Sequence, residues 1–345
     1  MSPLAIGKPA SDRDSNPDTT CSQYGISFVD GLRDTQDEGT DVQTGEQIAI
    51  KLEYINDGHE ALTNEGDIYS MLSGSIGIPE VKWLGMDGDF FVMIYALLGP
   101  SLEDLFVYCG EKFSLKTVLL LADQLICRMR RIHSKSLIHR DIKPGNFVMG
   151  SGRQGNVVYV IDFGLATEFS GNGTQQQEDG EEEEEEEEEE DGEFRRSLGG
   201  TSLYASLRNH SGRKQSWSDD MESLGYMLVH FARGSLPWQR LTAATDDELN
   251  EKIGRMKKGM SGRELCKGLP GEFARYIDYI RSLRFGVRPD YTRLRRNFQR
   301  LFVRMGFKYD QVFDWTHRLF DEYRERRSRV RSTRTIARSK RRSVR

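Results

Sequence analysis

A run of eight residues in the middle of the chain combines acidic, basic and amide side chains at a spacing that suits phosphoryl transfer. It reads His139-Arg140-Asp141-Ile142-Lys143-Pro144-Gly145-Asn146. This order fits the catalytic-loop pattern H-R-D-x-x-x-x-N, in which the acid accepts the hydrogen of a substrate hydroxyl and the asparagine binds a metal ion. We therefore predict that Asp141 is the catalytic base, that Asn146 is a metal ligand, and that Lys143 reaches the transferred phosphoryl group as a mobile point charge.

Three further residues complete the set that such a transfer needs. Asp162 begins the sequence Asp162-Phe163-Gly164, Lys51 ends the sequence Ala49-Ile50-Lys51, and Glu65 lies in the next segment. Each match is weak alone, because an aspartate beside a glycine is usually a turn and a lone lysine in a strand is usually solvated. Four matches in the correct order argue against coincidence.

The residue types indicate how the transfer would be catalysed. Phosphoryl transfer depends on positioning and charge neutralisation more than on covalent work. Asp162 and Asn146 offer oxygen ligands, which Mg²⁺, a hard cation, prefers. Lys51 would hold the α- and β-phosphates of ATP, and an ion pair with Glu65 would fix the lysine in place. The sequence therefore predicts that ATP and Mg²⁺ bind here.

The segments around these residues show strand and helix patterns. Residues 47–52 alternate polar and apolar side chains as a half-buried strand does, while 90–98 and 157–161 are apolar runs typical of buried strands. Residues 62–72 have the apolar spacing of a helix with one buried face. A longer helix follows, with Ser114 as its N-cap, and it ends just before the catalytic loop.

Helical patterns dominate the second half of the chain. We predict that Ser218 caps a helix with almost no polar face, which is therefore central and buried. Further helical patterns run past Phe273 to Tyr323. A few strands and one helix followed mainly by helices predict an α+β fold with two lobes, a small β-rich N-terminal lobe and a large helical C-terminal lobe.

Several longer runs resemble the casein kinase I family of protein serine/threonine kinases. The resemblance extends from about Gly39 to Trp315. The tripeptide Tyr204-Ala205-Ser206 stands where most kinases carry A-P-E, as it does in that family. The other matching runs are Gly99 to Phe106, Phe113 to Gln124, Ile132 to Lys135, Glu222 to Tyr226, Gly234 to Gln239 and Phe313 to Trp315.

The resemblance implies a kinase fold with ATP in the cleft between the lobes and protein hydroxyls as phosphoryl acceptors. The adenine would bond backbone groups of a hinge near Ala96 to Leu98, under Val148 and Ile161. Asp220 would be the buried helix aspartate that holds the catalytic loop. A bulky residue, Tyr95, would guard the back of the nucleotide pocket and keep that pocket small.

The chain departs from the family in the loop that covers the phosphates. Alignment back from Gly39 places residues 30–38 at the glycine-rich loop, and Gly31 is the one glycine there. A loop without glycines cannot bring its backbone N–H groups close to phosphates. Three hypotheses remain open: an active kinase, a pseudokinase or scaffold module with weak or no turnover, and a wrongly assigned start of the coding sequence over residues 1–38.

A second departure concerns the preference for acidic or already phosphorylated substrates that the family shows. Leu203 falls where the family carries arginine, Asp246 falls where it carries lysine, and Ala96 replaces an acid of the hinge region. Losing two cations and gaining an anion weakens the attraction for a phosphate group. We therefore predict a poor preference for primed substrates.

Charge is strongly segregated along the chain. Residues 178–193 hold 14 acidic and no basic residues, and without them the net charge of −5 becomes +9. We predict that 170–197 is an acidic disordered insertion, either merely solvated or regulatory. Residues 324–345 hold 11 lysines and arginines against one glutamate, and we predict a basic disordered tail over 321–345. Three interpretations stay open for it: a plain disordered extension, a nuclear import signal, or a weak nucleic-acid contact, the last of which lacks interleaved aromatic residues for base stacking.

These observations divide the chain into three parts. Residues 1–38 are predicted to be disordered or wrongly assigned, and 39–320 to form a kinase domain with an N-lobe over 39–98 and a C-lobe over 99–320. The four cysteines form no CxxC pair, which predicts reduced thiols rather than a zinc site or disulfide framework. No apolar run approaches the length of a membrane span. We expect a monomeric protein in the cytoplasm, the nucleus or both.

Overall fold

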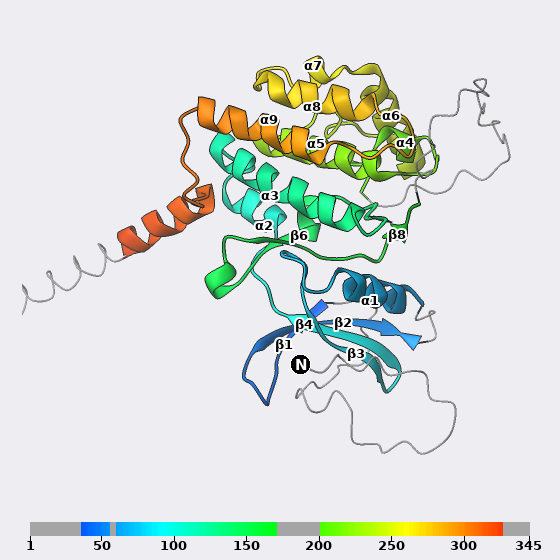
Figure 1. The fold of residues 1–345 in the computed structure, drawn as a ribbon, viewed down its shortest axis with the longest axis vertical. Coiled ribbons are helices and arrows are strands. Elements are labelled where there is room, and N and C mark those ends of the chain that lie inside the picture. Colours follow the sequence, from blue (N-terminus) through cyan, green and yellow to red (C-terminus); the bar gives the residue numbers. More distant parts are fainter. Residues whose placement is uncertain (1–35, 56–59, 171–200, 327–345) are drawn as a thin grey trace, which may run out of the picture.

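The computed structural model describes residues 36–55, 60–170 and 201–326, and these form two lobes (Figure 1). A small antiparallel sheet with one helix makes the first lobe, and a helical assembly makes the second. This is the predicted α+β architecture. The predicted segments 170–197 and 321–345 lie largely outside the described residues, as does most of 1–38.

The sheet has the strand order β1-β2-β4-β3, with every neighbouring pair antiparallel. Its one helix, α1, spans Glu60–Leu72. The sequence predicted the second strand, the helix and the fourth strand, with ends shifted by two residues at most. The strands are β1 (Gln36–Thr40), β2 (Gln47–Tyr54), β3 (Val81–Asp87) and β4 (Phe90–Ala96).

The two faces of this sheet bury different sets of side chains, because successive residues of a strand point to opposite faces. Ala49 and Met93 belong to the main hydrophobic core, which includes α1. Ile48, Ile50 and their neighbours form a separate aliphatic cluster against Trp83. Lys51 pairs in register with Met93, so its side chain leaves the strand on the face that looks toward α1.

Strand β1 begins at Gln36, inside the segment that was predicted to lack secondary structure. The prediction was wrong for 36–38, because strand pairing with β2 overrides a polar sequence: Gln36 pairs with Lys51 and Thr40 with Gln47. Among the described strands β1 lies at the edge of the sheet and pairs with β2 alone.

The second lobe is built around α3 and α5, which pack against each other and against α9 and α8 (Figure 1). Helix α5 is buried along its whole length except at its last residue, as its sequence predicted. A further helix over 314–326 follows these. The helices are α2 (Leu102–Tyr108), α3 (Leu115–His133), α4 (Leu207–His210), α5 (Trp217–Arg233), α6 (Asp246–Gly259), α7 (Gly262–Leu265), α8 (Gly271–Arg281) and α9 (Tyr291–Arg304).

The N-caps of the two central helices test the sequence analysis. Ser114 caps α3 as predicted, since its hydroxyl accepts from the N–H of Thr117 at 3.3 Å. The prediction that Ser218 caps α5 was wrong. Ser216 is the extended cap residue, and Asp219, three residues on, accepts from its N–H at 2.7 Å. An acid at the third helical position completes a capping box, and this selects the earlier serine.

Two short antiparallel pairs frame the catalytic segment. Strand β6 (Phe147–Met149) pairs with β7 (Val158–Val160), and β5 (Leu137–Ile138) pairs with β8 (Thr167–Glu168). Residues 139–146 therefore connect β5 to β6, and 161–166 connect β7 to β8. The loop with the catalytic motif and the loop with Asp162 therefore both connect the β5–β8 pair to the β6–β7 pair.

Two global predictions concern cysteines and membranes. Cys109, Cys127 and Cys266 are free, as predicted, and Cys21 lies outside the described residues. In the ranges that the structure covers, none of the helices combines the length and the apolar character that a membrane span requires.

Candidate active site

Three charged side chains from different elements meet between the lobes. The ammonium of Lys51 on β2 lies 2.7 Å from Glu65 Oε2 on α1 and 3.1 Å from Asp162 Oδ1 after β7. Burial alone lowers the pKa of Lys51, but the charges of Glu65 and Asp162 outweigh it and raise that pKa above its usual value. Burial raises the pKa of Asp162, but the charge and hydrogen bond of Lys51, together with the charges of His139 and Lys143, outweigh it, so that pKa falls. The ion pair between Lys51 and Glu65 that the sequence predicted is present.

Glu65 and Tyr69 also hold the segment that carries Asp162. The second oxygen of Glu65 accepts from the N–H of Phe163 at 3.0 Å, and the N–H of Asp162 donates to the hydroxyl of Tyr69 at 3.1 Å. Tyr69 packs edge-on against the ring of Phe163 at 5.0 Å. These contacts hold Asp162 in a left-handed conformation with φ of 64°, which a non-glycine residue adopts at some cost.

The second group surrounds Asp141 in the loop between β5 and β6. Its Oδ2 accepts from the ammonium of Lys143 at 2.6 Å and from the side-chain amide of Asn146 at 3.0 Å. The same amide also donates to the backbone carbonyl of Asp141 at 2.8 Å. Oδ1 accepts from the backbone N–H of Thr201 at 3.2 Å. The predicted catalytic side chains Lys143 and Asn146 therefore both donate hydrogen bonds to the carboxylate of Asp141.

A buried aspartate from α5 fixes the backbone of this loop. Asp220 accepts from the N–H of His139 at 2.7 Å and from the N–H of Arg140 at 2.8 Å. His133 lies 2.9 Å from the same carboxylate and 2.7 Å from the hydroxyl of Tyr291 on α9. Burial raises the pKa of Asp220, but hydrogen bonding and charge from His133 and His139 outweigh it, so the net shift is downward. Arg140 is held at φ of 68°, in the sparsely populated left-handed region.

The predicted hinge connects β4 to α2. Ala96 ends β4, the N–H of Leu97 donates to the carbonyl of Gln47 at 3.1 Å, and the N–H of Gly99 donates to the carbonyl of Met149 at 2.7 Å. Leu98 is half-buried between these two bonds. The hinge is therefore tied to β2 on one side and to β6 on the other.

Two apolar residues of the predicted adenine site come from the hairpin beside the hinge. Val148 on β6 is buried, and Ile161, just after β7, donates its N–H to the carbonyl of Asn146 at 3.0 Å. Tyr95 on β4 is buried and stacks with Tyr69, with ring centroids 6.3 Å apart. That this bulky side chain keeps the back of the nucleotide pocket small stays a prediction.

The donor set suits a hard cation. The amide nitrogen of Asn146 is engaged with Asp141, which leaves the amide oxygen as the free ligand atom, and Asp162 is a carboxylate that remains ionised. Within the described ranges no group of three or more His, Cys, Asp or Glu residues could hold a metal ion by itself. Two oxygen ligands match the manner in which Mg²⁺ binds, since it usually takes further ligands from substrate phosphates and water.

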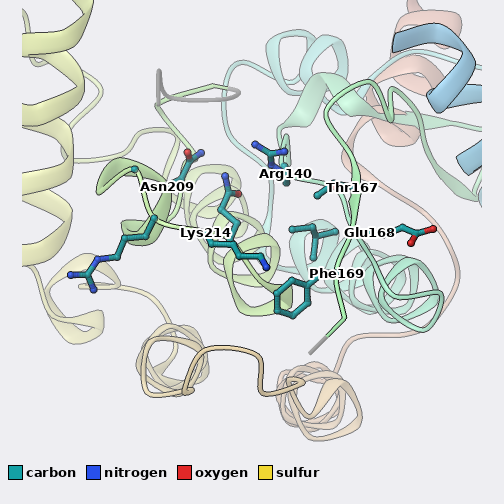
Figure 2. Close-up of a pocket in the computed structure, with 10 residues that line it drawn as sticks. Arg140, Thr167, Glu168, Phe169, Asn209 and Lys214 are labelled. Atoms are coloured by element: carbon teal, nitrogen blue, oxygen red, sulfur yellow. The ribbon is translucent and has the colours of Figure 1, made fainter. Parts of the chain in front are cut away.

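A pocket beside the catalytic loop draws side chains from three segments (Figure 2). Arg140 comes from the loop itself, Glu168 and Phe169 from the end of β8, and Asn209 and Lys214 from α4 and the turn after it. Arg213 adds a further cation to the lining. The pocket shares no residue with the predicted nucleotide site.

The two positions where the chain lacks the family's cations have structural roles of their own. Leu203 packs against the main hydrophobic core. Asp246 begins α6 directly after the N-cap Thr245, where an acid interacts favourably with the helix dipole. Neither Leu203 nor Asp246 lines the pocket beside the catalytic loop.

Sequence reasoning missed several residues that support the site. Tyr69 lies four residues after Glu65 on a helix, so the shared helix face was a usable signal. The bond from Thr201 to Asp141 and the contact between His133 and Tyr291 join residues far apart in the chain. No local sequence pattern predicts contacts between residues so far apart in the chain.

A comparison with family models agrees with this geometry. The model described as "Protein kinase domain" matches residues 37–267, more than half of the chain. The match begins inside β1 and includes Lys51, Glu65, the catalytic loop and Asp162.

Proposed function

This chain belongs to the protein kinase family, and we propose that it is a serine/threonine kinase of the casein kinase I type. In this proposal it transfers the γ-phosphoryl group of Mg-ATP to hydroxyls of protein substrates. Protein kinases take ATP and, typically, a divalent metal. The choice of serine and threonine as acceptors and the assignment to the casein kinase I type rest on the sequence resemblance from about Gly39 to Trp315.

The observation that carries the proposal is the assembly of two charged groups, one anchored on the sheet lobe and one on the helical lobe. Lys51, paired with Glu65 and Asp162, can neutralise phosphate charge on the side of the sheet lobe. Asp141 and Lys143 lie 2.6 Å apart on the side of the helical lobe. Such preorganised charges stabilise a phosphoryl-transfer transition state without reorganising during the reaction.

Each side chain then has a defined task. Bound Mg²⁺ would neutralise the phosphate oxygens and be held by Asp162 and Asn146. Asp141 would orient the substrate hydroxyl and accept its hydrogen. Lys143 would release Asp141 in part and contact the transferred group, which its flexible stem permits. Lys51 would fix the remaining phosphates.

Further features of the proposal rest on sequence. We propose that primed substrates gain little, because Leu203 and Asp246 occupy the positions of two cations and both have other structural roles. We also propose a monomer located in the cytoplasm or nucleus, with a nuclear import signal or a weak nucleic-acid contact in the basic tail. The acidic segment and that tail lie outside the described residues.

The test is turnover of Mg-ATP on casein by the purified full chain, followed by identification of the phosphorylated residue type. We expect phosphoserine and phosphothreonine, and an Asp141→Ala variant without activity. Phosphotyrosine as the main product would refute the serine/threonine assignment. An inactive wild-type chain that still binds ATP would favour the pseudokinase hypothesis over an active kinase.

A second experiment addresses the missing glycine-rich loop. Most of residues 30–38 lie outside the described ranges, and β1 begins at Gln36. If the wild-type chain is inactive, replacing residues 1–38 by a conventional glycine-rich loop separates the two remaining explanations. Recovery of turnover would indicate a wrongly assigned start, and continued inactivity would indicate a pseudokinase.

A further inference from the structure

Lys257, near the end of α6, is a fully buried lysine that the catalytic scheme does not use. Its ammonium nitrogen lies 2.8 Å from the carbonyl of Ser202 and 2.7 Å from the carbonyl of Ala205. His210 Nε2 completes the set at 3.0 Å. A lysine is rarely buried in full unless each of its polar contacts is satisfied.

The environment of this amine favours short bonds. Its nitrogen lies over the rings of Tyr226 and Trp238, at 4.9 and 5.0 Å from their centroids. Burial holds the pKa of Lys257 well below its usual value, and Glu222 and Arg281 oppose each other in their effect on it. Three partners, the two carbonyls and Nε2 of His210, surround the nitrogen, which equals the number of hydrogen bonds that a lysine side chain makes.

The two carbonyls belong to the segment 201–206, which is fixed at several further points. The indole N–H of Trp238 donates to the carbonyl of Leu203 at 2.8 Å, and the hydroxyl of Ser206 donates to Asp219 at 2.6 Å. Lys257 thus bonds the residues on either side of Leu203 and Tyr204. The segment has little freedom to shift while these bonds persist.

The same segment touches the proposed catalytic base. The N–H of Thr201, one residue before Ser202, donates to Asp141 Oδ1 at 3.2 Å. A displacement of the carbonyl of Ser202 therefore moves a group bonded to Asp141. In the proposed function a substrate hydroxyl lies beside Asp141, so segment 201–206, bonded to Asp141 through Thr201, borders that position.

We propose that Lys257 is a positioning residue that sets segment 201–206 against Asp141 and thereby governs the binding of the protein substrate. This inference rests on the proposed function for its turnover readout, but peptide binding tests it separately. A residue that only stabilises the fold would change the free energy of unfolding and leave substrate affinity unchanged.

The test compares Lys257→Met with Lys258→Met in the full chain. Methionine keeps the length of the side chain and removes the nitrogen, while Lys258 is an exposed neighbour on the same helix. We expect the KM for a casein-derived peptide to rise roughly 10-fold or more in Lys257→Met, because small displacements at a reacting centre are costly. The KM for ATP should stay within about 2-fold of wild type by the same principle, and Lys258→Met should behave as wild type.

Two additional measurements keep the test decisive. If Lys257→Met fails to fold, Trp238→Phe removes the bond to the carbonyl of Leu203 and should raise the peptide KM in the same direction. If the wild-type chain does not turn over, fluorescence anisotropy of a labelled peptide on that chain replaces KM by Kd. An unchanged peptide KM or Kd, or an equal change for peptide and ATP, would overturn the proposal.

Discussion

Lys51 in the sheet lobe and Asp141 in the helical lobe are both charged groups of one site, yet their supports differ. Lys51 is held by two carboxylates, one of which belongs to the other lobe. Asp141 belongs to a loop whose backbone is bonded to Asp220, a residue of the buried helix α5. The sheet side therefore depends on ion pairs across the cleft, whereas the helical side depends on the interior of one lobe.

This difference predicts which substitutions change turnover alone and which also change the free energy of unfolding. Changes on the sheet side should reduce turnover more than they reduce the free energy of unfolding, because Lys51 is itself about a quarter exposed, although its partner Glu65 is buried. Changes beneath the catalytic loop should reduce both quantities, because they leave buried polar groups without partners.

The largest effect is expected at Asp141 itself. Asp141→Asn removes the hydrogen acceptor and should lower kcat by roughly 10³-fold, with the unfolding transition close to that of wild type. Steady-state kinetics beside urea unfolding measures both. Asp310→Asn, a partly exposed carboxylate paired with Lys116, is the matched control and should retain full kcat. Equal kcat in the two variants would remove Asp141 from the mechanism.

Asp220 should show the strongest effect on stability. Asp220→Ala leaves the N–H groups of His139 and Arg140 and the ring of His133 without their buried acceptor, which should lower the free energy of unfolding by about 3–5 kcal/mol. Urea unfolding by fluorescence measures this change. A loss below about 1 kcal/mol, the usual worth of a single hydrogen bond, would show that the loop does not depend on α5.

Asp219 should make the helical lobe sensitive to pH. Burial raises its pKa from 3.8 to about 6, although hydrogen bonds from Ser206 and Ser216 act in the opposite direction. Between these two values the folded chain binds more protons than the unfolded chain, so stability falls as pH rises, by up to roughly 3 kcal/mol. Above about pH 6 this loss is complete.

The variant Asp219→Asn isolates that contribution. An asparagine does not titrate, so the free energy of unfolding of Asp219→Asn should lack the fall between pH 4 and pH 6 that Asp219 causes in wild type. The variant should therefore be more stable, relative to wild type, at pH 7 than at pH 4. Urea titrations of both proteins at the two values measure the difference. An identical difference at both would show that Asp219 does not titrate in this window.

On the sheet side, Glu65→Gln should reduce turnover more than it reduces the free energy of unfolding. Lys51 then keeps one carboxylate, Asp162, and loses its fixed position, so kcat/KM should fall roughly 10- to 100-fold. The unfolding midpoint should change little in comparison with Asp220→Ala. A large loss of stability with unchanged kcat/KM would contradict the claim that the sheet side contributes more to turnover than to stability.

The smallest effects compare one glycine in each lobe. A Cβ at Gly225 of α5 would lie 2.7 Å from Ile277 and 2.7 Å from Tyr276, both buried, whereas a Cβ at Gly66 of α1 would meet the end of the Leu84 side chain. Gly225→Ala should therefore cost about 1–2 kcal/mol. Gly66→Ala should cost less, because Leu84 is only half-buried and can turn aside. Thermal unfolding ranks the two, and the opposite order would contradict the tighter packing of the helical lobe.

The two lobes were also unequally predictable. Apolar periodicity located β2, α1, α3 and α5, because each buries a continuous face. It missed 36–38 of β1, whose polar residues form a strand through pairing with β2. It also placed the cap of α5 at Ser218 rather than Ser216, since capping depends on Asp219 as well.

The site divides in the same way. The motifs named Lys51, Glu65, Asp141, Lys143 and Asn146, and the structure brings these into two groups. Other residues that hold the groups were harder to find, because their bonds use backbone atoms: Thr201 donates its own N–H to Asp141, and Lys257 donates to the carbonyl of Ala205. A backbone acceptor or donor leaves no mark on the sequence of its own segment.

The hydrogen bonds from Tyr291 through His133 to Asp220 have a practical consequence for protein production. The match to the protein kinase domain ends at residue 267, yet α9 begins at Tyr291 and packs along α3. A recombinant chain cut at the end of the match would expose the face of α3 that α9 covers and remove one anchor of the catalytic loop. Expression and crystallisation should therefore retain residues through at least Arg304.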